Sequence, residues 1–371
     1  MKKKEKLVVN LTEEELLSKT IAAVRFPMAF LVVMIHGYFI KVIFNSGKTE
    51  IDFSNYPIFP KAMLFIGEIT SVAVPVFFII SGFLFFYKIS EFNKECYFSK
   101  LNKRIHSLLI PYLFWNTVVP LVSVLGHLLA PNVFSGNSSN ISDYSWKELI
   151  MMFWNNADSG YPVSSQLWFL RDLMIVVLAS PLIYLFVKYT KIWGVILLWG
   201  LWVFDIEPNI TGLNIISFFL FSLGAYFSIC KKNFVTVFLG MYNKGIGLFY
   251  LFVLIMAVYF DSTVYSPYFH KLCISVGIVF VIGLTANYLL KGGKSSSFLS
   301  KSSMFIYLIH PMPIIFLKKI VIMIVKPSND IEALLVYITC SVVITLICLS
   351  LFWVMRKYVP KFTSVITGGR V

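Results

Sequence analysis

Long apolar stretches, separated by charged or turn-forming residues, run along almost the whole chain. A bilayer core about 30 Å thick takes about 20 mostly apolar helical residues per crossing, so the pattern predicts ten membrane spans. They are 21–44, 61–86, 105–130, 167–187, 192–204, 211–230, 245–260, 268–290, 302–317 and 331–355. The fifth is short, but omitting it would invert every later span and move Lys231, Lys232, Lys291 and Lys294 to the outer side.

The distribution of Lys and Arg predicts the orientation of these spans. Both ends of the chain are basic, and with ten crossings most of the 32 Lys and Arg residues fall on one side, which the positive-inside rule assigns to the cytoplasm. We therefore predict an all-α integral membrane protein of the cell (inner or plasma) membrane, a single bundle of about ten helices with both termini cytoplasmic. Its expected parts are a cytoplasmic segment (1–20), the bundle (21–355) with an outer loop (131–166), and a cytoplasmic tail (356–371).

Composition excludes several other classes of protein. Only 13% of the 371 residues are charged and 58% are apolar, whereas soluble domains have roughly 25% charged residues. The net charge of +14 follows from membrane orientation, so we expect no nucleic-acid partner. The five cysteines form no CxxC pair, so neither a disulfide framework nor a metal site is expected. We expect no permanently bound cofactor, and no cleavable signal peptide because acidic residues interrupt the basic N-terminus.

The outer loop, 131–166, has two interpretations. It is rich in Ser, Asn, Asp and Gly and contains Trp146, Trp154 and Tyr161. It is either a solvated loop lying at the membrane interface, where Trp and Tyr are common, or a platform for a polar, sugar-like acceptor.

The first span contains two ionisable residues on one helical face. His36 follows Arg25 by eleven residues, which is close to three turns and about 16 Å along a helix. Arginine binds phosphate well, and a neutral imidazole in a cleft can act as a general base or nucleophile. This arrangement suits a cytoplasmic donor with an anionic head and a long arm. Alternatively, Arg25 extends to the inner headgroups and His36 bonds a neighbouring helix.

Other polar residues inside the spans need a partner, a cavity or a function, because the bilayer disfavours them. Glu68 is expected to pair with Arg or Lys, or to be protonated. Ser81 and Gly82 follow Pro75, which we expect to break the second helix, and small residues also allow close helix packing. His270 is expected at the outer interface.

Three further segments carry candidate residues. Lys103, Arg104 and His106 concentrate cations at the cytoplasmic end of the third span, where a phosphate-bearing ligand would arrive. In the fourth span Arg171 and Asp172 are adjacent and are expected to pair. In the ninth, Tyr307 and His310 lie deep in the membrane, and His310 is followed by Pro311 and Pro313.

Five segments together resemble the membrane-bound acyltransferase-3 family. They are the Arg25 and His36 pair, Val74-Pro75-Val76-Phe77-Phe78 with Ser81-Gly82, Lys103-Arg104 to Pro111-Tyr112, Leu167-Trp168-Phe169-Leu170-Arg171, and Tyr307-Leu308-Ile309-His310. The resemblance implies about ten helices and the transfer of acyl groups, commonly acetyl from cytoplasmic acetyl-CoA, to hydroxyls of surface glycans or other acceptors.

The resemblance also implies roles for individual residues. His36 would be catalytic, with Arg25 as its partner, and Arg104 would hold the donor phosphates. Many relatives carry a second arginine three positions later, where this chain has Ser107, so Lys103 or His106 could complete that site. Ser81 or Tyr307 could stabilise the oxyanion, and Glu68, Trp168, Arg171 and His310 would support the site or face the acceptor.

We therefore expect an O-acyltransferase that uses acetyl-CoA, or another acyl-CoA, as donor substrate and a glycan or other hydroxyl compound as acceptor. His36 would act as a general base or a transient acyl carrier. A transporter or flippase of a glycolipid or polyisoprenoid-linked sugar is the alternative, because it too needs charged residues and broken helices in the membrane. A membrane scaffold or sensing module is a third interpretation.

Overall fold

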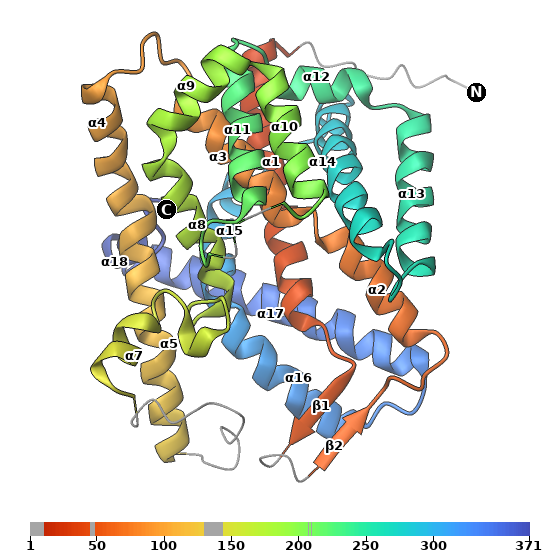
Figure 1. Ribbon diagram of the computed structural model, residues 1–371. Helices are drawn as coiled ribbons and strands as arrows, with labels where there is room; N and C mark the ends of the chain where they lie inside the picture. The colour runs from red at the N-terminus through yellow and green to blue at the C-terminus, as the bar shows by residue number, and fades with distance from the viewer. Residues whose placement is uncertain (1–10, 45–48, 130–143, 207, 209) are drawn as a thin grey trace.

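The structure is a computed structural model that describes residues 11–44, 49–129, 144–206, 208 and 210–371 (Figure 1). The last residue of the third predicted span (130), part of the predicted outer loop (131–143) and the first half of the predicted N-terminal segment lie outside the described residues.

The described chain is almost entirely helical (Figure 1). Its first half contains α1 (Glu13–Gly37), β1 (Lys41–Phe44), β2 (Thr49–Asp52), α2 (Phe59–Thr70), α3 (Ala73–Phe86), α4 (Lys94–Arg104), the π-helical turn η2 (Ile105–Leu109), α5 (Ile110–Leu129), α7 (Trp146–Met151), the short 3-10 turns η4 (Asn156–Asp158) and η5 (Ser165–Leu167), and α8 (Trp168–Leu178). Its second half contains α9 (Ser180–Thr190), α10 (Ile192–Val203), α11 (Ile215–Ile229), α12 (Phe234–Met241), α13 (Lys244–Tyr259), α14 (Ser266–Leu290), α15 (Ser297–Ile309), α16 (Pro311–Val325), α17 (Asp330–Tyr358) and α18 (Pro360–Ile366).

These helices confirm the prediction of an all-α membrane protein. Five helical segments of the described chain are long and apolar enough to cross a membrane, and the number is eight if each of three bent helix pairs forms one span. The shorter apolar helices α10 and α13 lie where the fifth and seventh spans were predicted. The count of ten spans and the cytoplasmic side remain predictions.

The fourth and ninth predicted spans are bent, and the helix of the sixth, α11, turns into α12 beyond the predicted end of that span at 230. Helices α8 and α9 meet at 67°, α11 and α12 at 106°, and α15 and α16 at 72°. The second helix of the first and third pairs begins with a proline in its first turn, where the missing amide hydrogen costs no helical hydrogen bond. In the second predicted span, Pro75 lies within the first turn of α3, so the interruption precedes it.

The first predicted span ends earlier than expected. Helix α1 stops at Gly37, and residues 41–44 form β1, which pairs antiparallel with β2. In β1 buried and exposed positions alternate, with Val42 and Phe44 buried against Phe53 and Phe59. This period of two is that of a half-buried strand, and it explains why an apolar stretch there is not helical.

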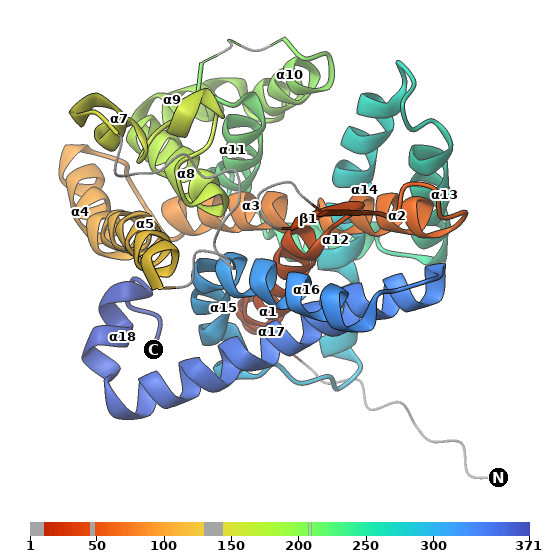
Figure 2. The ribbon, with the colours of Figure 1, turned by 90° about the horizontal axis from the view of Figure 1, so that it is seen from below.

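Helix α1 lies in the middle of the bundle and contacts α3, α14, α15, α16 and α17 (Figures 1 and 2). A capping box of Thr12 and Glu15 begins it, which satisfies two backbone amides that the helix leaves free. Residues of α1 pack into the main apolar core with α3, α8, α11 and α14. This position gives α1 access to several neighbours along its length.

Helices α3 and α11 cross closely at two glycines. A Cβ atom at Gly82 would collide with the backbone of Phe221, and one at Gly224 would collide with the backbone of Ile79. Gly82 therefore serves the close packing that the sequence suggested, while its neighbour Ser81 is available for another role.

The last long helix crosses the bundle obliquely (Figures 1 and 2). After α17 the chain turns into α18, which contacts α5, and Thr363, Ile366 and Thr367 are buried. The segment predicted as a cytoplasmic tail is thus ordered and packed against the bundle.

Candidate active site

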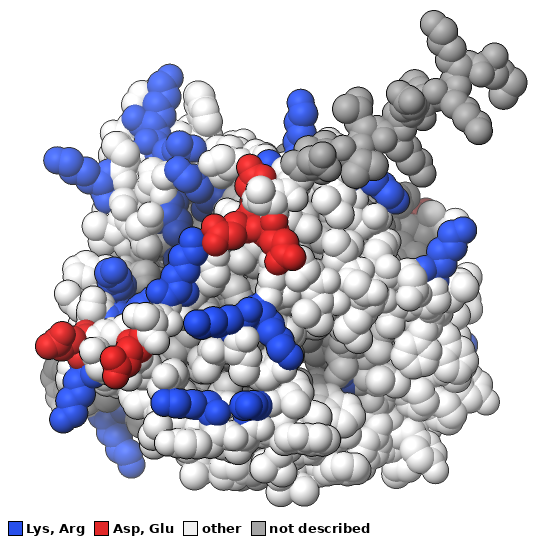
Figure 3. All heavy atoms as spheres, turned by 90° about the horizontal axis from the view of Figure 1, so that it is seen from above, with Lys and Arg blue, Asp and Glu red and all other residues white. Residues whose placement is uncertain are grey.

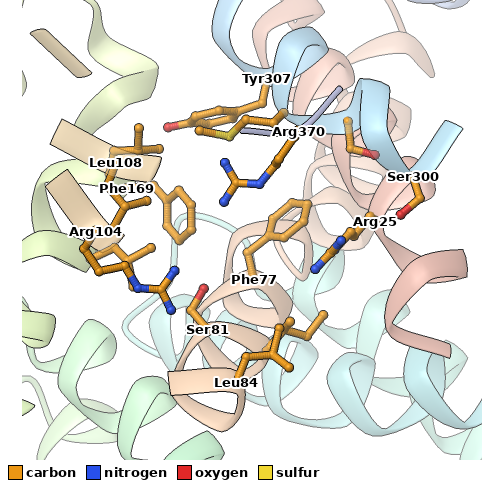
Figure 4. Close-up of a pocket in the computed structure, with 15 residues that line it drawn as sticks. Arg25, Phe77, Ser81, Leu84, Arg104, Leu108, Phe169, Ser300, Tyr307 and Arg370 are labelled. Carbon is orange, nitrogen blue, oxygen red and sulfur yellow. The ribbon is translucent and has the colours of Figure 1, made fainter. Parts of the chain in front are cut away.

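A cavity of about 180 Å³ lies among α1, α3, α8, α15 and the junction of α4 with η2 (Figure 4). Its polar side chains are Arg25, Ser81, Arg104, Ser300, Ser303, Tyr307 and Arg370, and no Asp or Glu of the described residues lines it. Rings of Phe77 and Phe169 lie between the arginines (Figure 4). The cavity thus combines apolar walls with three guanidinium groups.

The positive charges of this cavity have no acidic partner among the described residues. Neither Arg25 nor Arg104 forms an ion pair there, and the Arg104 guanidinium instead lies 5.7 Å from the centre of the Phe85 ring. Both side chains point into the cavity (Figure 4). Because a charge removed from bulk water needs compensation, the cavity favours an anionic ligand.

The π-helical turn η2 sets which residues of the third predicted span face this cavity. Arg104 precedes the turn and Leu108 lies within it, and both line the cavity. Lys103 and His106, predicted for the same site, lie on the exposed side, and Nδ1 of His106 is 3.2 Å from the Asn102 carbonyl oxygen. Helical turns of this kind often occur at functional sites.

His36 lies at the other end of α1 and does not line the cavity. Because α1 is continuous from Arg25 to His36, the expected separation of about 16 Å along the helix holds. The His36 ring packs edge-on against the ring of His310, with centroids 5.0 Å apart. The structure therefore brings together the two deep histidines that the sequence singled out separately.

His310 is fully buried at the bend between α15 and α16. Its Nδ1 lies 2.9 Å from the Ile306 carbonyl oxygen, and because a carbonyl oxygen only accepts, Nδ1 is the protonated nitrogen. Nε2 then carries the lone pair, and no hydrogen-bond partner for it is present among the described residues. A buried polar atom without a partner needs an explanation, and a catalytic role is one such explanation.

Tyr307 connects the cavity to the histidine pair. It lines the cavity one helical turn before His310, and its ring packs against that of Phe169 with centroids 5.9 Å apart. Its hydroxyl donates to the Gln166 carbonyl oxygen at 2.5 Å, and Gln166 Nε2 donates to the Leu308 carbonyl oxygen at 3.2 Å. This hydrogen bonding holds η5 against α15 between the two parts of the site.

Glu68 lies away from this site. Its carboxylate is 3.0 Å from Nδ1 of His270, a partly buried residue. The partner of Glu68 is therefore a histidine, and not the arginine or lysine that the sequence suggested.

A second cavity has a volume of about 590 Å³. Residues that line it include Trp168, Arg171, Trp202 and Asn214, together with Tyr161 from the predicted outer loop. Arg171 and Asp172 form the expected pair at 2.9 Å, with both side chains buried. Asn214 also donates to Asp172, and Arg171 Nη1 donates to carbonyl oxygens in the outer segment, those of Trp154 and Gly160, at 2.6 and 2.9 Å. Arg171 therefore fixes the wall of this cavity.

Sequence reasoning did not identify Arg370, Ser300 or Ser303 as part of the first cavity. The pair Gly368-Gly369 before Arg370 is a signal of a tight turn, but nothing in the sequence relates it to Arg25 or Arg104. Among the described residues no group of three or more His, Cys, Asp or Glu side chains could hold a metal ion.

Comparison with known proteins gives a family. A family model described as "Acyltransferase domain" matches residues 20–353. The chain is also similar to the "Succinoglycan biosynthesis protein ExoH" of Rhizobium meliloti (strain 1021), with 28% identity over 209 residues. That match covers 54% of this chain and 53% of the relative, so it spans about half the length of the curated protein. No solved structure matches. Since the family model spans nearly the whole helical bundle, the chain belongs to the acyltransferase-3 family of multi-pass membrane proteins.

Proposed function

We propose that this protein transfers an acyl group, with acetyl as the first choice, from a cytoplasmic acyl-CoA to a hydroxyl group of a cell-surface glycan or its lipid-linked precursor. The observation that carries this proposal is the cavity with three guanidinium groups and, within the described part of the chain, no carboxylate side chain. Coenzyme A bears several phosphate groups, and arginine is the side chain best suited to bind them.

The distribution of charged side chains on the protein surface supports an assignment of the side on which the donor binds. The face of the molecule where α1 begins carries many Lys and Arg side chains and few acidic ones (Figure 3). We assign this face to the cytoplasm by the positive-inside rule. Arg25 and Arg104 then bind the donor phosphates, and the acyl-bearing arm extends along α1 toward His36.

In this proposal His36 acts as the general base. The acceptor hydroxyl loses its proton to the imidazole while its oxygen attacks the thioester carbonyl. The new ester bond forms, the carbon–sulfur bond breaks, and coenzyme A leaves as a thiol after taking up the proton. His310, whose ring contacts His36, orients it through a side chain that is itself fixed to the Ile306 carbonyl oxygen.

The assignment of a glycan acceptor has two supports. The relative ExoH is named for succinoglycan biosynthesis, and the second cavity offers indole rings at Trp168 and Trp202 beside the polar groups of Arg171 and Asn214. Aromatic faces with a few polar groups are suited to ring-shaped polar ligands. In this proposal the sugar acceptor binds at the second cavity.

The test is acyl transfer from labelled acetyl-CoA in membranes that contain the protein, with a glycan extract as acceptor. His36→Ala is expected to abolish transfer, and His270→Ala, which removes a histidine outside the site, is expected to retain it. Arg25→Ala is expected to raise the KM for acetyl-CoA. Equal transfer with His36→Ala would refute its role, and no turnover of the donor by the wild-type protein would favour transport instead.

A further inference from the structure

The segment after α17 folds back onto the first cavity. The indole Nε1 of Trp115 in α5 donates to the Ile366 carbonyl oxygen at 3.1 Å. Lys301 Nζ in α15 donates to the Val371 carbonyl oxygen at 2.8 Å. These two contacts come from different helices, so they fix the segment between α5 and α15.

Gly368 allows the segment to approach the π-helical turn. It has a φ of +66°, and a Cβ atom there would lie 2.8 Å from the Cα of Ser107. Only glycine combines this backbone conformation with so close an approach. Gly369 also has a positive φ, of +84°, but nothing lies within 4 Å of the place of its Cβ.

This turn brings Arg370 into the cavity. Its Nη1 donates to the carbonyl oxygens of Thr367 at 3.1 Å and Ser107 at 3.5 Å. Its guanidinium points into the space that Arg25 and Arg104 also face (Figure 4). Arginine has five N–H donors, and neither Nε nor Nη2 has a hydrogen-bond partner among the described residues.

The three arginines repel one another in the absence of an anion. Desolvation, together with the positive charges of Arg25 and Arg104, lowers the pKa of Arg370 to about 10. Arg370 is therefore charged at neutral pH, and all three groups carry charge in a cavity that no described Asp or Glu lines.

We propose that Arg370 is a ligand-binding residue, which completes with Arg25 and Arg104 a site for a diphosphate group. The assignment rests on the proposed function, in which this group belongs to the acyl-CoA donor. The segment from Gly368 to Arg370 is then part of the donor site. A planar guanidinium held on the Ser107 carbonyl oxygen has its other edge free for bidentate phosphate binding.

The test is ligand binding to the purified full chain in detergent, with coenzyme A and inorganic diphosphate as separate probes. Arg370→Ala is expected to weaken binding of both by about ten- to a hundredfold, the usual effect of losing a charge-assisted hydrogen bond. Arg370→Lys is expected to recover part of that loss. Lys361→Ala removes an exposed cation from the same segment and is expected to bind as the wild-type protein does.

A second pair of variants tests the position of Arg370 without removing it. Gly368→Ala is expected to weaken diphosphate binding as Arg370→Ala does, whereas Gly369→Ala is expected to have a smaller effect. Binding within twofold of wild type for Arg370→Ala with both probes would overturn the proposal, as would a wild-type protein that binds neither probe. Diphosphate binding that depends on Arg370, without binding of coenzyme A, would support the site and refute the acyl-CoA donor.

Discussion

The crossing of α3 and α11 allows a quantitative prediction for Gly82→Ala. The added Cβ would lie 2.9 Å from the carbonyl carbon of Phe221 and 3.0 Å from its Cα. Carbon atoms prefer separations of about 3.5 to 4.0 Å, and the atoms in the way belong to a helix backbone that cannot rotate aside. The helices must therefore separate by roughly half an ångström or more, and overpacking of this kind costs about 1–3 kcal/mol.

This cost is expected as a midpoint of thermal unfolding in detergent that is lower by roughly 1–4 °C, because the entropy of unfolding is about 2 cal/mol/K per residue over 371 residues. Gly200→Ala in α10 is the matched control, because outside its own stretch of helix no described residue lies within 4 Å of the place of its Cβ. Combining Gly82→Ala with Gly224→Ala is expected to cost less than the sum of the single changes, since both act on one interface.

Activity provides a second measurement of the same change. Ser81 precedes Gly82 and lines the arginine cavity, so a displaced α3 moves a wall of the site. Acyl transfer is therefore expected to fall together with stability. A Gly82→Ala protein that unfolds at the same temperature as Gly200→Ala would show that the two helices can separate freely, and the close-packing argument would be wrong.

Three further substitutions test the other polar pairs. Glu68→Gln weakens a partly exposed contact with His270, so the free energy of unfolding should fall by no more than about 1 kcal/mol. Acyl transfer should persist, and a variant without transfer activity would place Glu68 in the site. Asp172→Asn removes the charge that pairs with buried Arg171, which should lower the free energy of unfolding by about 3–5 kcal/mol. We expect a low yield of folded protein, and a variant with wild-type yield and stability would contradict the argument. His310→Ala should lower kcat for acyl transfer with little change in the KM for acetyl-CoA, and the reverse pattern would assign His310 to donor binding.

Hydropathy located the apolar segments but not their bends. Pro181 and Pro311 lie at two of the bends, yet a proline in a span indicates an interruption and not its angle. The angle depends on which neighbours the second half of the span packs against, and those contacts lie far away in the chain. The hairpin at 41–52 was missed for a related reason: a short apolar stretch has no length to distinguish helix from strand.

The candidate site was predictable where it depends on one straight helix. The spacing of Arg25 and His36 needed only the geometry of α1. Lys103 and Arg104 both precede the π-helical turn, so which of them faces the cavity depends on how the end of α4 packs, whereas His106 lies within the turn. The turn changes the helical phase of the residues after it and leaves no mark on hydropathy. The position of Arg370 in the cavity depends on its contact with Ser107, far away in the chain, and no local sequence pattern encodes that contact.

The bend after His310 has an electrical and energetic consequence for the site. A helix that begins inside a bilayer would leave its first amide hydrogens without partners, at several kcal/mol each in hydrocarbon. Pro311 and Pro313 have no amide hydrogen to leave unpaired, and the His310 amide still donates to the Ile306 carbonyl oxygen at 3.1 Å. The chain can therefore begin a new helix, with the partial positive charge of its N-terminus, beside the histidine pair at little cost. Because both prolines are covalent features of the chain, the start of a new helix beside His310 is encoded in the sequence itself.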